Sequence, residues 1–129
     1  MLSYLTLFFL YSFVGWIIDS SYRSVEAKKY SSGSFLPFLA PIYGVAGVSL
    51  TLFFQWSSLS LFLDILLGTV LVVMIEFFGG IFCVCVFGRR YWDYSKETYN
   101  LLGHISLLHS VYWLLLVIGF RLLFPFFFS

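Results

Sequence analysis

The sequence has few charged residues: Asp, Glu, Lys and Arg make up 10% of its 129 residues, whereas 61% are hydrophobic. A soluble domain normally carries about 25% charged residues, so this chain cannot cover a water-exposed surface. Its net charge of +1 excludes the broad basic patch that a nucleic-acid-binding protein needs. We therefore expect an integral membrane protein that contacts membrane lipid and binds no nucleic acid.

The sequence also lacks the common catalytic and cofactor motifs. No G-x-x-x-x-G-K-[ST] segment occurs, so the chain binds no nucleotide through a P-loop. Neither H-E-x-x-H nor G-x-S-x-G is present, which removes two familiar hydrolase signatures. The only cysteines, Cys83 and Cys85, would point to nearly opposite sides of a helix. We predict no disulfide, no metal site and no cofactor.

Long apolar runs fill most of the chain instead. A bilayer core of about 30 Å needs roughly 20 apolar residues in a helix. We predict an all-α membrane protein, a single helical transmembrane domain over residues 1–129, with four spans at residues 2–23, 35–54, 59–87 and 97–124. The third run would be about 43 Å long as a helix. It must tilt, kink or protrude, and Gly79-Gly80 is the expected weak point.

The basic residues predict the orientation. Six of the seven Lys and Arg residues lie in the first connection, Ser20–Ser34, or the third, Gly88–Asn100, both of which include the adjoining ends of the spans. With four spans, these two connections share one side of the membrane. The positive-inside rule makes that side cytoplasmic and both termini extracytoplasmic. Arg121, the exception, is expected to extend its side chain to the outer interface. Asp64 is expected to complement the dipole at the start of the third span.

The second span opens with Pro41-Ile42-Tyr43-Gly44, and Gly47 follows one turn later. Proline and glycine weaken a helix, so we predict that the second helix is broken near Pro41–Gly44. Such a break can line a site, as in transporters, with Tyr43 among the lining residues. It can equally be a packing kink where small residues let helices approach closely. Both interpretations are open at this point.

Glu76 is the only charged residue between Asp64 and Arg89. An ionisable residue inside a membrane span is costly unless it faces a protein interior or a cavity, so it is a functional candidate by default. A cation could neutralise it, with Arg89, Arg90 or Arg23 as the candidates. Glu76 is the strongest single candidate for a binding group.

Further candidates lie near the cytoplasmic ends of the spans. Asp19 and Arg23 form an i, i+4 pair that is either an interfacial salt bridge or part of a site. Asp93 lies between aromatic residues, Ser95 is expected to cap the last helix, and His109 is expected to be a hydrogen-bonded structural histidine. The full set of ligand or cavity candidates is Glu76, Asp93, Asp19, Arg23, Tyr43, Trp92, Arg89, Arg90, Asn100 and His104.

Several segments occur in an order that resembles a known family. They are Tyr11–Trp16, Pro41–Gly44, Glu76, Trp92–Ser95, Asn100-x-x-Gly103-x-Ile105, and Ser110 followed by Trp113. Over Leu7 to Trp113 the chain resembles the bacterial family catalogued as putative ABC-transporter type IV permeases. That family tends to have glutamate where this chain has Asp19, and Arg-Gly and Gly-Pro pairs where it has Ser34–Phe38.

The resemblance implies a multi-pass protein of the bacterial plasma (inner) membrane that serves as a small transport subunit with a cytoplasm-facing polar cavity. Four spans are too few to enclose a pathway, so it would work as a homo-oligomer or beside other subunits and a separate ATPase. Two alternatives stay open. One is a membrane-embedded enzyme acting on a lipid or lipid-linked substrate, with Glu76 or Asp93 as base and Arg89 and Arg90 on a phosphate. The other is a non-catalytic accessory subunit.

Overall fold

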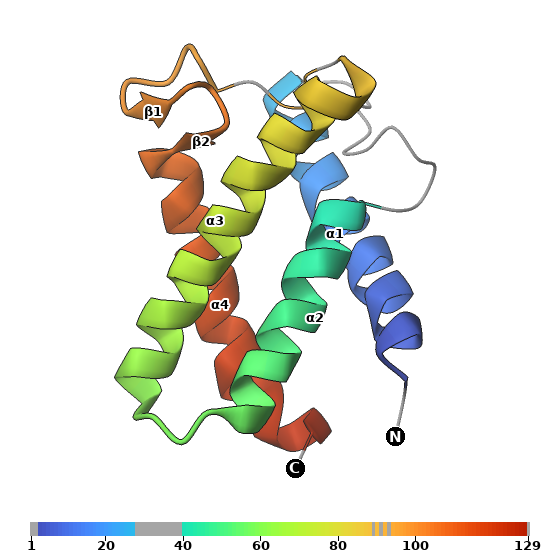
Figure 1. The fold of residues 1–129 in the computed structure, drawn as a ribbon, viewed down its shortest axis with the longest axis vertical. Coiled ribbons are helices and arrows are strands. Elements are labelled where there is room, and N and C mark those ends of the chain that lie inside the picture. Colours follow the sequence, from blue (N-terminus) through green and yellow to red (C-terminus); the bar gives the residue numbers. More distant parts are fainter. Residues whose placement is uncertain (1–2, 28–39, 89, 91, 93, 129) are drawn as a thin grey trace. The chain divides into compact units, whose positions relative to one another are not determined.

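A computed structural model describes residues 3–27, 40–88, 90, 92 and 94–128. It contains four helices and one short hairpin in the order α1 (Tyr4–Ala27), α2 (Pro41–Trp56), α3 (Leu61–Phe87), β1 (Asn100–Leu101), β2 (Ile105–Ser106) and α4 (Leu107–Phe128), as Figure 1 shows. Three of the described helices are long and apolar enough to cross a membrane: Tyr4–Tyr22 within α1, Leu61–Phe87 and Leu107–Phe128. The predicted helical membrane architecture is confirmed at this level, whereas the hairpin was not predicted.

The chain divides into two compact units, Met1–Ser49 and Leu50–Ser129, and the boundary falls within α2. In the first unit, glycines of both helices lie against large side chains of the other helix. A Cβ atom on Gly15 would overlap the Tyr43 ring, and one on Gly47 would overlap the Tyr11 ring. These glycines therefore let α1 and the start of α2 pack closely.

α2 begins at Pro41, where proline fits because the first residue of a helix has no intrahelical N–H partner. The backbone N–H of Ala40, just before it, donates to the carbonyl of Ser12 in α1 at 2.9 Å. From Pro41 onward the helix is continuous to Trp56. A break near Pro41–Gly44 would thus have to lie at or before Pro41, and it stays a prediction because residues 28–39 are outside the described part.

α3 has clear boundary signals at both ends. Ser60 is its N-cap, and the Ser60 hydroxyl accepts a hydrogen bond from the Leu63 N–H at 3.3 Å. Gly88 ends the helix with a left-handed φ of 67°. The helix continues through Gly79-Gly80, the expected weak point, without interruption.

α4 begins later than predicted. Ser95 does not cap it, because residues 94–106 form a turn and the β1–β2 hairpin. The cap is Ser106, whose hydroxyl accepts a hydrogen bond from the His109 N–H at 3.1 Å. The error arose because the segment after Asn100 is apolar enough to continue a span, although Gly103 adopts a left-handed φ of 74° there.

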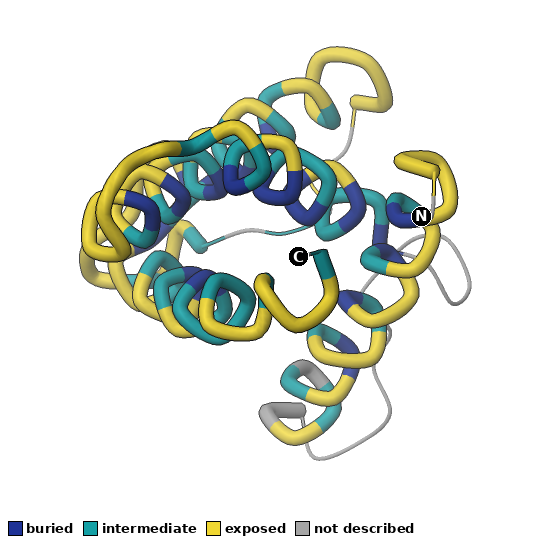
Figure 2. Tube along the Cα trace, turned by 90° about the horizontal axis from the view of Figure 1, so that it is seen from below, coloured by how far each residue is buried: buried dark blue, intermediate teal, exposed yellow. Residues whose placement is uncertain are grey.

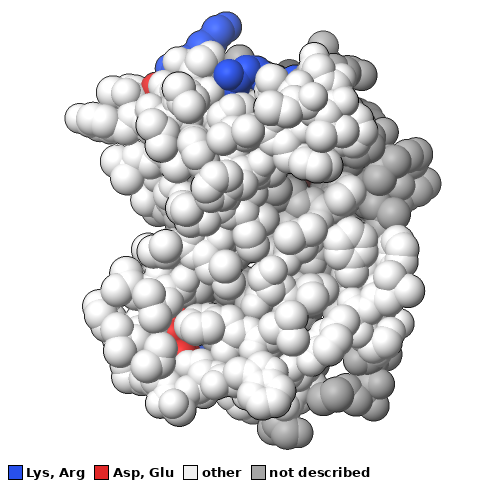
Figure 3. Space-filling view, in the orientation of Figure 1, with Lys and Arg blue, Asp and Glu red and all other residues white. Residues whose placement is uncertain are grey.

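Burial and charge follow the pattern of a lipid-facing protein. On each helix the buried positions lie along one side, and large apolar side chains remain exposed on the other (Figure 2). On the face drawn in Figure 3, Lys and Arg side chains gather at the end that carries the hairpin, and little other charge is visible. Because exposed apolar surface of this extent is unsuited to water, it indicates burial in lipid.

Candidate functional site

The inner side of α3 carries one continuous buried stripe. Its members recur every fourth residue, which places them on one helix face, and they are Asp64, Gly68, Val72, Glu76 and Gly80. The two carboxylates are twelve residues apart, about 18 Å along the helix axis at 1.5 Å per residue. One face of α3 thus carries two buried acidic groups at two separate positions along the helix axis.

Glu76 is buried, with 6% of its surface exposed. The hydroxyl of Tyr94 donates a hydrogen bond to its Oε2 at 3.1 Å. The Tyr94 ring stacks on the imidazole of His109, with centroids 3.9 Å apart and planes within 9°. His109 Nδ1 in turn shares a hydrogen bond of 2.7 Å with the Ser106 hydroxyl. A polar chain of four side chains therefore runs from Glu76 to the start of α4.

His104 anchors the hairpin to α3 one turn further along. Its imidazole lies directly over Gly80, where any Cβ atom would overlap the ring. It also meets the edge of Phe77, with centroids 5.8 Å apart. The carbonyl of His104 accepts a hydrogen bond from the indole N–H of Trp92 at 2.9 Å. Gly80 is thus required for close approach of the hairpin, not as a point of helix weakness.

Asn100 holds the segment that carries Tyr94. Its side-chain amide donates to the carbonyl of Glu97 at 2.9 Å, and its Oδ1 accepts from the Gly103 N–H at 3.0 Å. The Tyr94 N–H also donates to the Gly103 carbonyl at 2.9 Å. Both ends of the Asn100 amide are therefore engaged with backbone, so Asn100 helps to position this segment.

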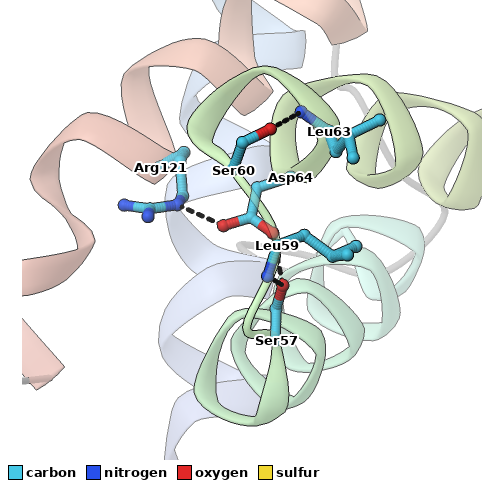
Figure 4. Close-up of polar contacts among 6 residues, drawn as sticks. All are labelled: Ser57, Leu59, Ser60, Leu63, Asp64 and Arg121. Atoms are coloured by element: carbon cyan, nitrogen blue, oxygen red, sulfur yellow. Dashed lines mark hydrogen bonds and ion pairs between the residues drawn. The ribbon is translucent and has the colours of Figure 1, made fainter.

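The second carboxylate, Asp64, forms an ion pair that sequence reasoning missed (Figure 4). Its Oδ2 lies 2.9 Å from Nε of Arg121 in α4, and its Oδ1 accepts a hydrogen bond from the Ser57 hydroxyl. The guanidinium also lies over the Phe54 ring, 5.7 Å from its centroid. Arg121 is therefore paired with a buried carboxylate of α3, a contact that the expectation of an extended side chain did not include.

An apolar layer separates the two acidic positions. Val72 and Val117 are completely buried. A Cβ on Gly68 would come within 3.2–3.3 Å of Leu50, Phe54 and Val117, tighter than an ordinary van der Waals contact. This closely packed layer lies between Glu76 and Asp64 along α3.

The other predicted candidates are distributed differently. Arg89 and Asp93 lie outside the described residues, as does the side chain of Arg23. Arg90 is exposed at the end of α3. Asp19 and Tyr43 are half-buried in the Met1–Ser49 unit, apart from the unit that holds Glu76.

Within the second unit the structure brings together Glu76, Trp92, Asn100 and His104 of the predicted set. It adds Tyr94, Ser106 and His109, and the prediction of His109 as a hydrogen-bonded histidine is confirmed. Among the described residues, no group of three or more His, Cys, Asp or Glu side chains could hold a metal ion. The arrangement can therefore supply a carboxylate, a phenol and imidazoles, which suit binding of a proton or of an organic cation.

Comparison with known proteins identifies a family. The sequence profile of the family described as putative ABC-transporter type IV matches residues 6–128, nearly the whole chain. Neither the curated proteins nor the solved structures contain a match to it.

Proposed function

This chain belongs to the putative ABC-transporter type IV family, and from that premise we propose that it is a small membrane subunit of a transporter. In this proposal Glu76 is the binding group for a proton or for a positively charged group of the substrate. The cavity opens toward the cytoplasm, and the protein acts as an oligomer or with further subunits and a separate ATPase, in the inner membrane of a bacterium.

The observation that carries this proposal is the burial of Glu76 in a helix without neighbouring charges. A carboxylate at such a position costs several kcal/mol unless protein or a cavity surrounds it, and such residues commonly mark substrate or ion pathways. The Tyr94 hydroxyl donates a hydrogen bond of 3.1 Å to its Oε2 and so fixes the position of the carboxyl group.

The apolar layer around Val72 and Val117 supports access from one side. It separates Glu76 from the Asp64–Arg121 pair, which links α3 to α4 at the other end. A transport subunit needs such a barrier, because a continuous polar path would leak. Opening the barrier on the Asp64 side would then require α3 and α4 to move relative to each other.

The first experiment is a mild-detergent purification of the tagged full-length chain from its native membrane, with mass spectrometry of every co-purifying protein and lipid. We expect a stoichiometric ATPase. The assay that follows compares its ATP-driven uptake for the wild type, Glu76→Gln, and the matched control Glu97→Gln, an acid outside the stripe. Glu76→Gln should retain the ATPase subunit and lose uptake, and the control should retain both.

A preparation without an ATPase would contradict the proposal. If that preparation instead carried one lipid or lipid-linked species, it would favour the enzyme alternative, in which Glu76 acts on that molecule. If it carried a different membrane protein, it would favour the accessory subunit.

A further inference from the structure

The tip of the β1–β2 hairpin combines an unfavourable backbone conformation with an exposed apolar side chain. Leu102 has a φ of 56°, and Gly103 follows with a φ of 74°. The His104 N–H donates to the Leu101 carbonyl at 3.1 Å and closes the turn. Two successive positive φ angles define a type I′ turn, for which Asn-Gly is the favoured pair. This chain places leucine where asparagine would be less strained.

Leu102 is not held there by packing, because 65% of its surface is exposed. Its neighbours are similar: Leu101 in β1 is 53% exposed, and Tyr99, just before β1, is 71% exposed. A strained residue persists only when something else requires it, and strain of this kind concentrates at functional positions. The hairpin and the residue before it therefore present three large side chains that are each more than half exposed.

The hairpin lies beside the end of an apolar span, not far beyond it. His104 packs on Gly80, seven residues before α3 ends at Phe87, which corresponds to about 10 Å along the helix. α4, a second span, begins directly after β2 at Leu107. Figure 1 shows the hairpin at the side of the last turns of α3, next to the start of α4. Phe82 and Val86, two exposed apolar side chains of α3, lie in these last turns of the helix.

Cationic side chains accompany the apolar tip. Arg90 and Lys96, both exposed, lie in the same connection, and Figure 3 shows Lys and Arg gathered at this end. Apolar side chains flanked by cations are the usual signature of segments that lie in the interface of an anionic membrane. We propose that the hairpin turn at Leu102, together with Leu101 and Tyr99, inserts into the headgroup region of the same bilayer that α3 and α4 cross. This anchoring would fix the segment that carries Tyr94 over Glu76.

The test measures depth in the full-length protein. Single cysteines replace Leu102 and, as the control, Lys96, in a Cys83→Ala/Cys85→Ala background, and each is spin-labelled. The proteins are reconstituted in vesicles of phosphatidylethanolamine and phosphatidylglycerol. We expect the ratio of collision with oxygen to collision with a water-soluble nickel chelate to be several-fold higher at position 102 than at position 96. Equal ratios with high nickel accessibility would overturn the proposal and leave the tip for a soluble protein partner.

Leu102→Asn separates insertion from folding, because asparagine suits the turn better than leucine. A spin label at Leu101 reports on the neighbouring side chain. We expect this variant to resist SDS as well as the wild type does. The ratio of oxygen to nickel collision at the Leu101 label should fall several-fold, toward the value of a water-exposed position. An unchanged label in the folded variant would contradict the role of Leu102 as an anchor.

Discussion

The ion pair between Asp64 and Arg121 gives the most sharply defined stability prediction. Removing one partner of a buried pair costs about 3–5 kcal/mol, because the other charge is left uncompensated. The two partners are not equally buried: the Asp64 side chain is 4% exposed and that of Arg121 is 23% exposed. Arg121→Gln should therefore lie near the upper end, about 5 kcal/mol, since it leaves the more deeply buried charge. The loss for Asp64→Asn should be smaller, about 3 kcal/mol, because the Arg121 guanidinium stays partly exposed to solvent and still lies over the Phe54 ring.

In the assay, purified protein in mild detergent is titrated with SDS, and circular dichroism monitors the loss of helix. The double variant Asp64→Asn/Arg121→Gln leaves no uncompensated charge, so it should lose less free energy of unfolding than either single variant. Glu97→Gln serves as the control and should change the free energy of unfolding by no more than about 0.5 kcal/mol. Additive losses in the double variant would refute the reasoning, because they would mean that the two side chains do not act as a pair.

Two further predictions concern packing and capping, both measured as free energies of unfolding. Gly80→Ala should lose about 1–3 kcal/mol because its methyl group overlaps the His104 ring. Gly119→Ala, a helical glycine with no neighbour within 4 Å of its Cβ position, should be neutral or gain up to about 1 kcal/mol, and equal effects at both glycines would contradict the proposed contact. The Ser106→Ala variant should lose about 1 kcal/mol of unfolding free energy because it removes the cap of α4, and an unchanged value would contradict this cap.

The helices themselves could be predicted from the sequence because long apolar runs of this kind form helices in a membrane. A run as long and apolar as Leu61–Phe87 forms a helix in lipid, since a helix satisfies its backbone groups within the segment itself. Ser60 and Gly88 mark its ends with recognised capping residues. The prominence of Glu76 was equally readable, because it is the one charge in a long apolar run, and its burial is confirmed.

The hairpin and the partners of the two carboxylates could not be predicted in the same way. The Asn100–Ser106 segment mixes Leu and Ile with Asn, Gly, His and Ser, and its strand pairing covers only two residues on each side. Tyr94 reaches Glu76 from eighteen positions further along the chain, and Arg121 reaches Asp64 from fifty-seven. Such contacts depend on how α3 and α4 pack, which hydrophobic periodicity does not specify when every face of a helix is apolar.

The central claim is that Glu76 is a binding group and not a structural charge, and the free energy of unfolding of Glu76→Gln tests it directly. The side-chain carbonyl of glutamine can still accept the Tyr94 hydrogen bond, and a neutral group needs no cation. The account therefore predicts a loss of no more than about 1 kcal/mol, comparable with one hydrogen bond, together with loss of uptake. A loss of about 3–5 kcal/mol, the value for a broken buried ion pair, would show that the Glu76 charge holds the fold together and would contradict the account.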